Sequence, residues 1–395
     1  MTELVLDPAR NLETLLRCPS VTPEEGGALE ALERMLAPLG FSTERPVFHE
    51  DGEASVENLL ATRGSQGPHL CFAGHTDVVP PGPEGDWRHP PFSAAVENGE
   101  MWGRGAVDMK GGIACFVAAL ARLVARGALP DAGRVSLLVT GDEEGPAVNG
   151  TVKLLRHAEA RGLRFDACLV GEPTNPDALG DMVKIGRRGS LSGELTLTGR
   201  QGHVAYPDRA DNPLHRLGPV LQSLLHPLLD GGTSRFQPSN LEVTSVDTGN
   251  PSTNVVPASA TVRFNVRFND CWTGETLRTE LERRIEAGLA ACPRGPGEHA
   301  VRWREPVSEC FVTAPGALTQ TLGEAIEAVT GRVPDLSTSG GTSDARFIKN
   351  HCAVVEFGLV GRTMHMADER VALSDLETLT RIYETFIARW FAAHA

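Results

Sequence analysis

The sequence predicts an α/β fold made of two domains: a two-piece domain with a mostly parallel central sheet flanked by helices, and an inserted α+β domain with an antiparallel sheet. Three observations lead to this prediction. The chain has 395 residues, more than one ordinary core accommodates. Continuously apolar segments alternate with helix-like segments in its first half and again near its end. Between these regions, apolar residues alternate singly with polar ones, as in strands with one exposed face.

The first 187 residues alternate between helix-like and strand-like segments. The segment 28–39 follows a helix-start signal at 22–25, and Gly40 ends it. The segment 111–126 is apolar almost all round, which predicts a buried helix. The run 134–140 is continuously apolar, as expected of a strand buried on both faces. Further helices are predicted at 12–16 and 152–161, and further strands at 55–62, 69–73 and 167–170.

The pattern changes near residue 187. The segment 189–198 alternates between polar and apolar residues, which predicts a half-exposed strand of an antiparallel sheet. Similar strands are predicted at 241–246 and 260–268, and helices at 214–229 and 275–290. The stretch 292–298 is rich in proline and glycine and predicts a linker.

After this linker the α/β pattern returns. Helices are predicted at 317–330 and 375–392, with an apolar strand at 353–357 between them. We therefore place the first part of the two-piece domain at 1–187, the inserted domain at 188–301 and the second part at 302–395.

Composition narrows the range of partners and locations. A net charge of −14 disfavours nucleic acid and anionic membranes, because both would be repelled. The eight cysteines are scattered without a Cys-x-x-Cys pair, which predicts a reducing compartment without disulfides or thiolate metal sites. The N-terminus lacks a secretory signal, and the longest apolar stretch, 113–121, is too short to span a bilayer. We expect a soluble, cytoplasmic protein.

Ionisable side chains follow the predicted strands. His75 comes after the strand 69–73, Glu143 and Glu144 come after 134–140, and Glu172 comes after 167–170. Ligands of open α/β sheets bind at the carboxyl ends of the strands, so these side chains should meet at one edge. Two adjacent acids there would repel each other unless a cation lies beside them.

Two further candidates complete this set. Asp108 lies in the glycine-rich stretch 103–112, before the predicted buried helix, and His365 lies in the C-terminal piece. Alone, Asp108 could be a helix N-cap, and the glycine spacing does not match a nucleotide-binding loop. Two histidines, a shared aspartate and two glutamates, with open positions for water, suit two zinc ions.

The remaining acids can serve the reaction itself. One acid of the 143–144 pair can bind metal while its neighbour holds a water as general base. Asp77 lies two residues after His75 on the same side of an extended segment. Its carboxylate can accept the imidazole N–H and fix the tautomer of His75.

With these residues in place, the chain resembles the zinc-dependent M20 metallopeptidase family over essentially its whole length. The motifs that indicate the family are Gly74-His-Thr-Asp-Val-Val79, Gly103-Arg-Gly-Ala-Val-Asp-Met-Lys-Gly-Gly112 and Asp142-Glu-Glu-Gly145. Within the family the chain is most similar to the succinyl-diaminopimelate desuccinylases. The motifs that indicate this branch are Gly186-Arg-Arg-Gly-Ser190, Gly202-His-Val-Ala-Tyr-Pro207 and Ser339-Gly-Gly-Thr-Ser-Asp344.

The resemblance implies a role for each residue of the expected metal site. His75 and Glu172 would hold one zinc ion, and Glu144 and His365 would hold the other. Asp108 would bridge both ions, and cobalt could replace zinc. The general base, and later the proton donor to the leaving amine, would be Glu143, while Asp77 would orient His75.

The resemblance also implies roles for the inserted domain. It would be the lid and dimerisation domain of a homodimer, and His203 would reach the partner subunit's active site to stabilise the oxyanion. The substrate would be a small amide that bears carboxylates, N-succinyl-LL-2,6-diaminopimelate, cleaved in lysine and diaminopimelate biosynthesis. The residues expected to grip it are Arg187, Asn254, Arg267, Gly341 and Thr342.

Two alternatives stay open. Another M20 deacylase, such as an acetylornithine deacetylase, would use the same zinc site and differ only in the residues that grip the substrate. The motifs at 186–190 and 339–344 favour the desuccinylase over this deacylase and also over an M20 dipeptidase. A non-catalytic ligand-binding protein of the same fold is a different class, and it would have no use for Glu143.

Overall fold

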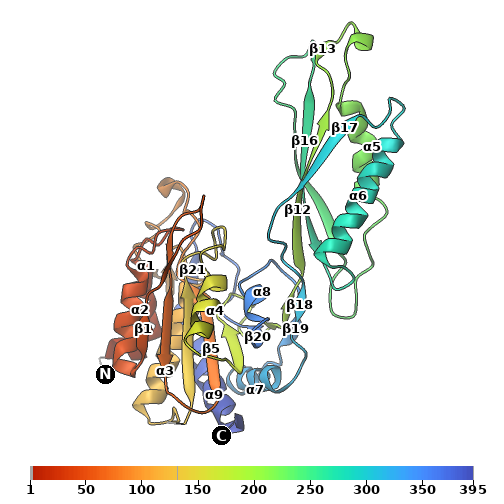
Figure 1. The fold of residues 1–395 in the computed structure, drawn as a ribbon. Coiled ribbons are helices and arrows are strands. Elements are labelled where there is room, and N and C mark those ends of the chain that lie inside the picture. The colour runs from red at the N-terminus through yellow and green to blue at the C-terminus, as the bar shows by residue number, and fades with distance from the viewer. Residues whose placement is uncertain (1–2, 131, 395) are drawn as a thin grey trace. The chain divides into compact units, whose positions relative to one another are not determined.

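Figure 1 shows a computed structural model, which describes residues 3–130 and 132–394. The chain divides into two compact units. The first unit contains Met1–Ile185, Thr313–Ser337 and Ser343–Ala395, and the second contains Gly186–Val312 and Thr338–Thr342. The inserted segment therefore forms a unit of its own, and in the sequence it separates two pieces of the first unit.

An eight-stranded sheet forms the centre of the first unit. Its order is β1-β4-β8-β5-β9-β20-β10-β19, and β8, β5, β9 and β20 pair in parallel. The edge pair β1 and β4 is antiparallel. The mostly parallel α/β sheet predicted from the sequence is thus confirmed. The strands are β1 (Ser42–Glu44), β4 (Leu59–Arg63), β5 (His69–His75), β8 (Arg134–Thr140), β9 (Ala167–Val170), β10 (Met182–Lys184), β19 (Asp335–Ser337) and β20 (Ala353–Glu356).

Helices flank this sheet and bury its apolar side chains. The most buried is α3 (Lys110–Ala125), which packs against α1 and α9. Phe116 on α3 stacks on Phe72 of β5 with ring centroids 4.0 Å apart, and Tyr383 of α9 contacts both rings edge-on. Each such buried aromatic side chain contributes about 2–3 kcal/mol of hydrophobic stabilisation. The other helices are α1 (Pro8–Leu16), α2 (Ala28–Leu36), α4 (Thr151–Ala160), α7 (Ala317–Thr330), α8 (Ala345–Ile348) and α9 (Leu373–His394).

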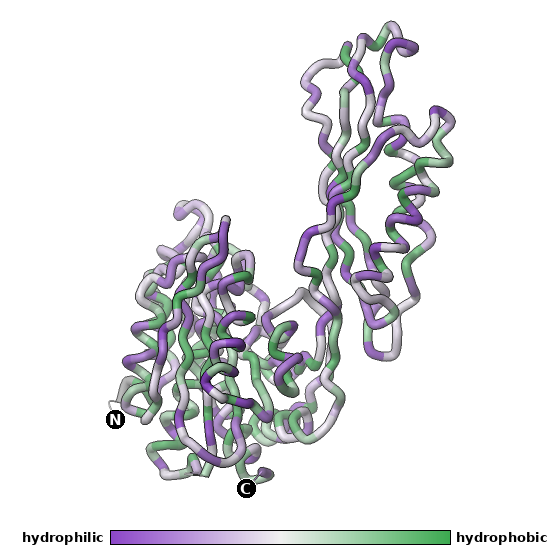
Figure 2. Tube along the Cα trace, viewed as in Figure 1, coloured by the Kyte–Doolittle hydropathy of each residue, from purple (hydrophilic) through white to green (hydrophobic). Residues whose placement is uncertain are grey.

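The second unit is a four-stranded antiparallel sheet with helices on one face (Figure 1). The order is β14-β16-β12-β17, with β12 (Gly189–Thr198), β14 (Asn240–Asp247), β16 (Ser259–Phe268) and β17 (Glu298–Trp303). Helices α5 (Leu214–Leu225) and α6 (Gly274–Ala290) pack on the apolar side chains of the sheet. Hydrophilic and hydrophobic residues alternate along the long strands of this unit (Figure 2). The antiparallel sheet predicted from the alternation is confirmed.

Short strands complete both units. In the first unit β21 (Arg370–Ala372), β7 (Glu100–Trp102) and β6 (Ala95–Glu97) form one small sheet, and β2 (Val47–Phe48) pairs with β3 (Val56–Glu57). In the second unit β11 (Gly186–Arg187) pairs with β18 (Phe311–Val312), and β13 (Gly202–His203) pairs with β15 (Val255–Val256).

The predicted boundary between residues 301 and 302 differs from the structure. It falls inside β17, which pairs with β12 from Gly193 to Thr198, and the second unit continues to Val312. The proline- and glycine-rich stretch 292–298 is therefore a turn between α6 and β17, and not a linker between domains. Its composition misleads because tight turns and linkers use the same residues.

Another difference concerns the predicted strand 55–62, which is interrupted at Asn58. The Asn58 side chain is buried and donates to the carbonyl oxygens of Val56 and Asn149. Predicted strands at 134–140, 167–170 and 189–198 have the bounds of β8, β9 and β12.

His69 at the start of β5 links the stability of the first unit to pH. Its imidazole is fully buried and contacts the carbonyl oxygen of Arg164 and the Ser136 hydroxyl, each at 2.8 Å. Burial, assisted by the charge of Arg134, lowers the pKa of His69 from 6.5 to about 4. The unfolded chain therefore binds a proton in this range that the folded chain does not, so stability falls as the pH is lowered.

We expect His69→Gln to reduce this pH dependence. The free energy of unfolding of the unaltered, metal-free protein should fall by up to about 1.4 kcal/mol per pH unit between about pH 6.5 and pH 4 because of His69. Denaturant unfolding at several pH values measures the slope. The control is His49→Gln, which removes an exposed histidine and should keep the slope. Equal slopes in all three proteins would contradict the assignment.

Candidate metal centre

The predicted metal residues meet at the carboxyl ends of the parallel strands. His75 is the last residue of β5, Glu144 follows the end of β8, and Glu172 follows the end of β9. Asp108 precedes α3, and His365 lies in the loop between β20 and β21. Because neighbouring parallel strands end at the same edge, residues far apart in the sequence come together there.

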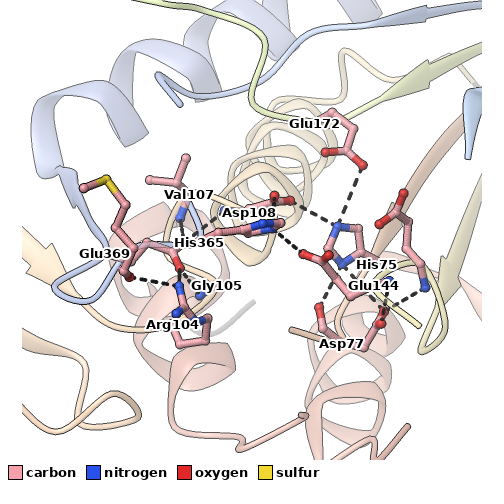
Figure 3. Close-up of polar contacts among 12 residues, drawn as sticks. His75, Asp77, Arg104, Gly105, Val107, Asp108, Glu144, Glu172, His365 and Glu369 are labelled. Atoms are coloured by element: carbon pink, nitrogen blue, oxygen red, sulfur yellow. Dashed lines mark hydrogen bonds and ion pairs between the residues drawn. The ribbon is translucent and has the colours of Figure 1, made fainter. Parts of the chain in front are cut away.

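The hydrogen bond of His75 fixes which of its nitrogens is free. Its Nδ1 lies 2.8 Å from the carbonyl oxygen of Asp77, which can only accept, so Nδ1 carries the proton. The Nε2 atom is therefore the nitrogen available to a metal ion, and it lies 3.2 Å from Oδ1 of Asp108 and 3.8 Å from Oε1 of Glu172. The imidazole is thereby oriented as a metal ligand (Figure 3).

Asp108 lies between the two histidines. Its Oδ1 faces Nε2 of His75, and its Oδ2 lies 3.1 Å from Nε2 of His365. The same His365 nitrogen is 2.8 Å from Oε1 of Glu144. The contacts therefore form two groups, His75 with Glu172 and His365 with Glu144, which share the Asp108 carboxylate (Figure 3).

This chemistry fits divalent metal ions. The ligand atoms of His75, Asp108 and Glu144 all lie within 4.8 Å of one another, and those of His75, Glu143 and Glu172 do so as well. Burial, together with neighbouring carboxylates, raises the pKa of both Glu143 and Glu172 well above its usual range. Buried acids that repel one another are stabilised by a cation between them, and imidazole with carboxylate is a common ligand set for zinc.

Asp77 has a different contact from the one predicted. The imidazole N–H of His75 is directed to the backbone carbonyl of Asp77, while the nearest carboxylate oxygen is 3.6 Å away. That carboxylate instead accepts hydrogen bonds from the backbone N–H groups of Glu143, at 3.3 Å, and Glu144, at 3.0 Å. Asp77 therefore orients His75 through its backbone and the two glutamates through its side chain.

The loop that carries the glutamate pair is also held from its other end. The buried carboxylate of Asp142 accepts a hydrogen bond of 2.7 Å from the backbone N–H of Asn149. Burial raises the pKa of Asp142, and the nearby backbone N–H groups of Asn149, Ala147 and Val148 partly offset that rise. Asp77 and Asp142 together therefore restrain the backbone of the loop that carries Glu143.

Glu369 is a positioning residue that the sequence reasoning missed. Its carboxylate is fully buried and accepts from the backbone N–H groups of Gly105, Val107 and Asp108, at 3.0, 2.8 and 3.2 Å. It also pairs with Arg104 at 2.7 Å. One side chain thus holds the whole turn that presents Asp108 (Figure 3). The only sequence signal for this role is that Glu369 lies four residues after the predicted ligand His365. A single glutamate outside any recognisable motif does not predict such a contact.

The other predicted residues belong to the second unit. Arg187 on β11 is buried, and its Nη1 donates to the carbonyl oxygen of Gly341 at 3.1 Å. The hydroxyl of the next residue, Thr342, lies 3.3 Å from the hydroxyl of Ser308. Arg187, Gly341 and Thr342 therefore lie in one place, although 154 positions separate the first two in the sequence.

His203, Asn254 and Arg267 lie elsewhere in the second unit. His203 on β13 is exposed, and its Nδ1 accepts a hydrogen bond from the backbone N–H of Ala205 at 3.1 Å. The backbone of Asn254 is joined to the same loop through the N–H of Val204. Arg267 lies on β16, opposite residues of β12 and β14.

In the described part of the chain, no helix is both long and apolar enough to cross a membrane.

Solved structures of several hydrolases share this fold. A metallo-carboxypeptidase of Sulfolobus solfataricus aligns with a TM-score of 0.78 and 19% identity, over 99% of this chain and 100% of its own. A tripeptidase of Staphylococcus aureus gives 0.79 and 18%, over 97% and 98% of the two chains. Human carnosine dipeptidase 1 gives 0.75 and 18%, over 98% and 96%.

A family model assigns the chain. The model of peptidase family M20/M25/M40 matches residues 71–389, which include His75, Asp108, the glutamate pair, Glu172 and His365. This range covers most of both units. The chain belongs to peptidase family M20/M25/M40, and it is a metal-dependent hydrolase with a candidate two-metal site.

Proposed function

We propose that this hydrolase removes the succinyl group from N-succinyl-LL-2,6-diaminopimelate, giving succinate and LL-diaminopimelate. The observation that carries the proposal is the cluster of buried Arg187 with Gly341 and Thr342 in the second unit. A guanidinium group forms paired hydrogen bonds with a carboxylate, and the succinyl group ends in one. The motifs around these residues are those in which the sequence resembles the desuccinylases.

The proposal includes two zinc ions, which cobalt can replace. His75, Asp108 and Glu172 would hold one ion, and Asp108, Glu144 and His365 would hold the other. When bound, such ions polarise the amide carbonyl and lower the pKa of a coordinated water to near neutrality. The carboxylates of Glu172 and Glu144 would then each neutralise charge on a different ion, and Asp108 would fix the spacing between the two.

The protein's own residues would move the protons. Glu143 would take a proton from the attacking water, and the water oxygen would bond to the amide carbon. Glu143 would then give the proton to the amine nitrogen as the carbon–nitrogen bond breaks. Asp77 and Asp142 support this role because they fix the backbone around Glu143.

The second unit would complete the site in a homodimer. We assign His203 of one subunit to the active site of the other, where it would donate a hydrogen bond to the oxyanion. Its exposure on the short strand β13 is compatible with contact to another subunit. Arg267 and Asn254 would contact the carboxylates and backbone of the amine half of the substrate.

A direct comparison of substrates tests the proposed specificity. We expect the zinc-loaded protein to hydrolyse N-succinyl-LL-2,6-diaminopimelate with a kcat/KM at least about tenfold above that for N-acetylornithine. Arg187→Lys should reduce this ratio, because lysine keeps the charge but loses the paired donors. Release of free amine measures both rates. A preference for N-acetylornithine would reject the desuccinylase assignment and favour the alternative deacylase.

Glu143→Ala separates proton transfer from metal binding. We expect kcat for the preferred substrate to fall by about 10²–10⁴, because this is the usual contribution of a general base. The variant should keep its zinc, measured by elemental analysis, because Glu143 is not one of the five proposed ligands. Glu144→Ala is the matched control and should lose metal. Substantial turnover by zinc-loaded Glu143→Ala would argue against the role.

Glu369→Gln tests the support of Asp108. Replacing one carboxylate oxygen by an amide N–H places a donor against the donors of Arg104 or the 105–108 turn. We expect metal affinity, measured by competition with a chelator, to weaken by about 10–100-fold. The control is Asp368→Asn, whose side chain accepts from the backbone of Arg88 instead. Unchanged affinity in Glu369→Gln would show that the turn does not need this carboxylate.

A further inference from the structure

The second unit has a hollow on the sheet face that α5 and α6 leave uncovered. Along β12, Leu191 and Leu195 point into the core beneath the helices, so the intervening Ser192 and Glu194 point to the other face. These two residues line a hollow of about 500 Å³ that reaches β14, β16 and β17. Pockets of this volume accommodate a small molecule.

The hollow is positively charged. Three arginines line it, Arg263, Arg302 and Arg304, and Glu194 is its one acid among the described residues. The net charge of these four side chains is plus two, in a chain whose net charge is −14. Such a concentration of cations in an acidic protein favours an anionic ligand.

The pairing of strands shows which of these charges are already neutralised. Glu194 lies opposite Arg263 on β16 and Arg302 on β17. Its carboxylate pairs with Nε of Arg263 at 2.8 Å. For Arg302 and Arg304, no carboxylate within 4.0 Å is found among residues 3–130 and 132–394. Arg302 on β17 and Arg304, which directly follows this strand, therefore have charge to offer a ligand.

The rest of the lining combines the apolar residues Phe264 and Trp303 with polar side chains on an irregular stretch of backbone. The register of β14 shifts between Val243 and Ser245, and the extra residue, Thr244, lines the hollow. Asn265 donates to the hydroxyl of Ser192 at 3.0 Å, so that hydroxyl can direct its own proton to a ligand. A bulge that opens the sheet and a hydroxyl donor beside two arginines form a site for acceptor oxygens.

We propose that this hollow binds a small dianion, a molecule with two carboxylate or phosphate groups. Arg302 and Arg304 flank Trp303, the last residue of β17, so the Cα atoms of the two arginines are separated by about 7 Å. Two anionic groups of one molecule can therefore each contact a different guanidinium. The site is independent of the proposed substrate, because none of its residues belongs to the metal centre or to the Arg187 cluster.

Titration calorimetry on the full-length, zinc-loaded protein tests the proposal. The first probe is 1,3-benzenedisulfonate, because sulfonates are poor zinc ligands, and benzenesulfonate is the matched monoanion. We expect saturable binding of the disulfonate, weakened about tenfold or more in the double variant R302Q/R304Q. Glu194→Gln should strengthen binding, because it removes the competing carboxylate. Glutarate and inorganic phosphate as further probes then show which anionic group the site prefers.

The control variant is Arg283→Gln, which removes the same charge from the exposed face of α6. It should bind the disulfonate as the unaltered protein does, and amide hydrolysis by R302Q/R304Q should stay within about twofold of the unaltered rate. The proposal is wrong if no probe binds saturably, if R302Q/R304Q binds as tightly as the unaltered protein, or if Arg283→Gln weakens binding as strongly.

Discussion

The position of the Asp108 carboxylate between two imidazoles is the constraint on which the rest of the metal centre depends. Each of its oxygens faces a different histidine, so one side chain sets the separation of both ligand groups. Asp108 has this position because Glu369, from the C-terminal piece, holds the backbone of the preceding turn. The small sheet brings those two distant segments together, because β21 pairs with β7 in antiparallel orientation and places Arg370 opposite Trp102. The buried carboxylate of Glu369 thus links the C-terminal piece of the fold to the position of Asp108 in the metal centre.

The electrostatics of the centre follow from this arrangement. Acids that are buried close together would be protonated or displaced without positive charge among them. Hydrogen bonds with Asp108 and Glu144 raise the pKa of His365 to about 10, which shows how strongly these carboxylates attract a cation. Asp77, Asp142 and Glu369 are themselves buried, and they hold the backbone beside the acids of the centre. Divalent ions bound among these acids would offset their mutual repulsion. The geometry therefore favours a metal-dependent enzyme over a scaffold that retained the fold.

Much of this arrangement could be predicted from the sequence, because apolar periodicity and strand-end residues are local signals. The predicted bounds of the strands β8, β9 and β12 agree with those in the structure. Every proposed metal ligand lies at or near the edge of the parallel sheet, as the sequence predicted. The contact of Asp77 could not be predicted, because backbone and carboxylate oxygens of one residue compete for the same imidazole N–H. Glu369 and the final boundary of the second unit depend on tertiary pairing, which leaves no local pattern.

The second unit shows how one sheet can serve two purposes. Its apolar face is committed to α5 and α6, so substitutions there disturb the core. Its other face is polar and bears arginines at positions that packing does not dictate, such as Arg302 and Arg304. A chain of net charge −14 repels anions at long range, and at physiological ionic strength this repulsion decays within about 8 Å. Local arginines then determine binding, so an acidic protein can recognise anionic molecules wherever its sheet concentrates positive charge.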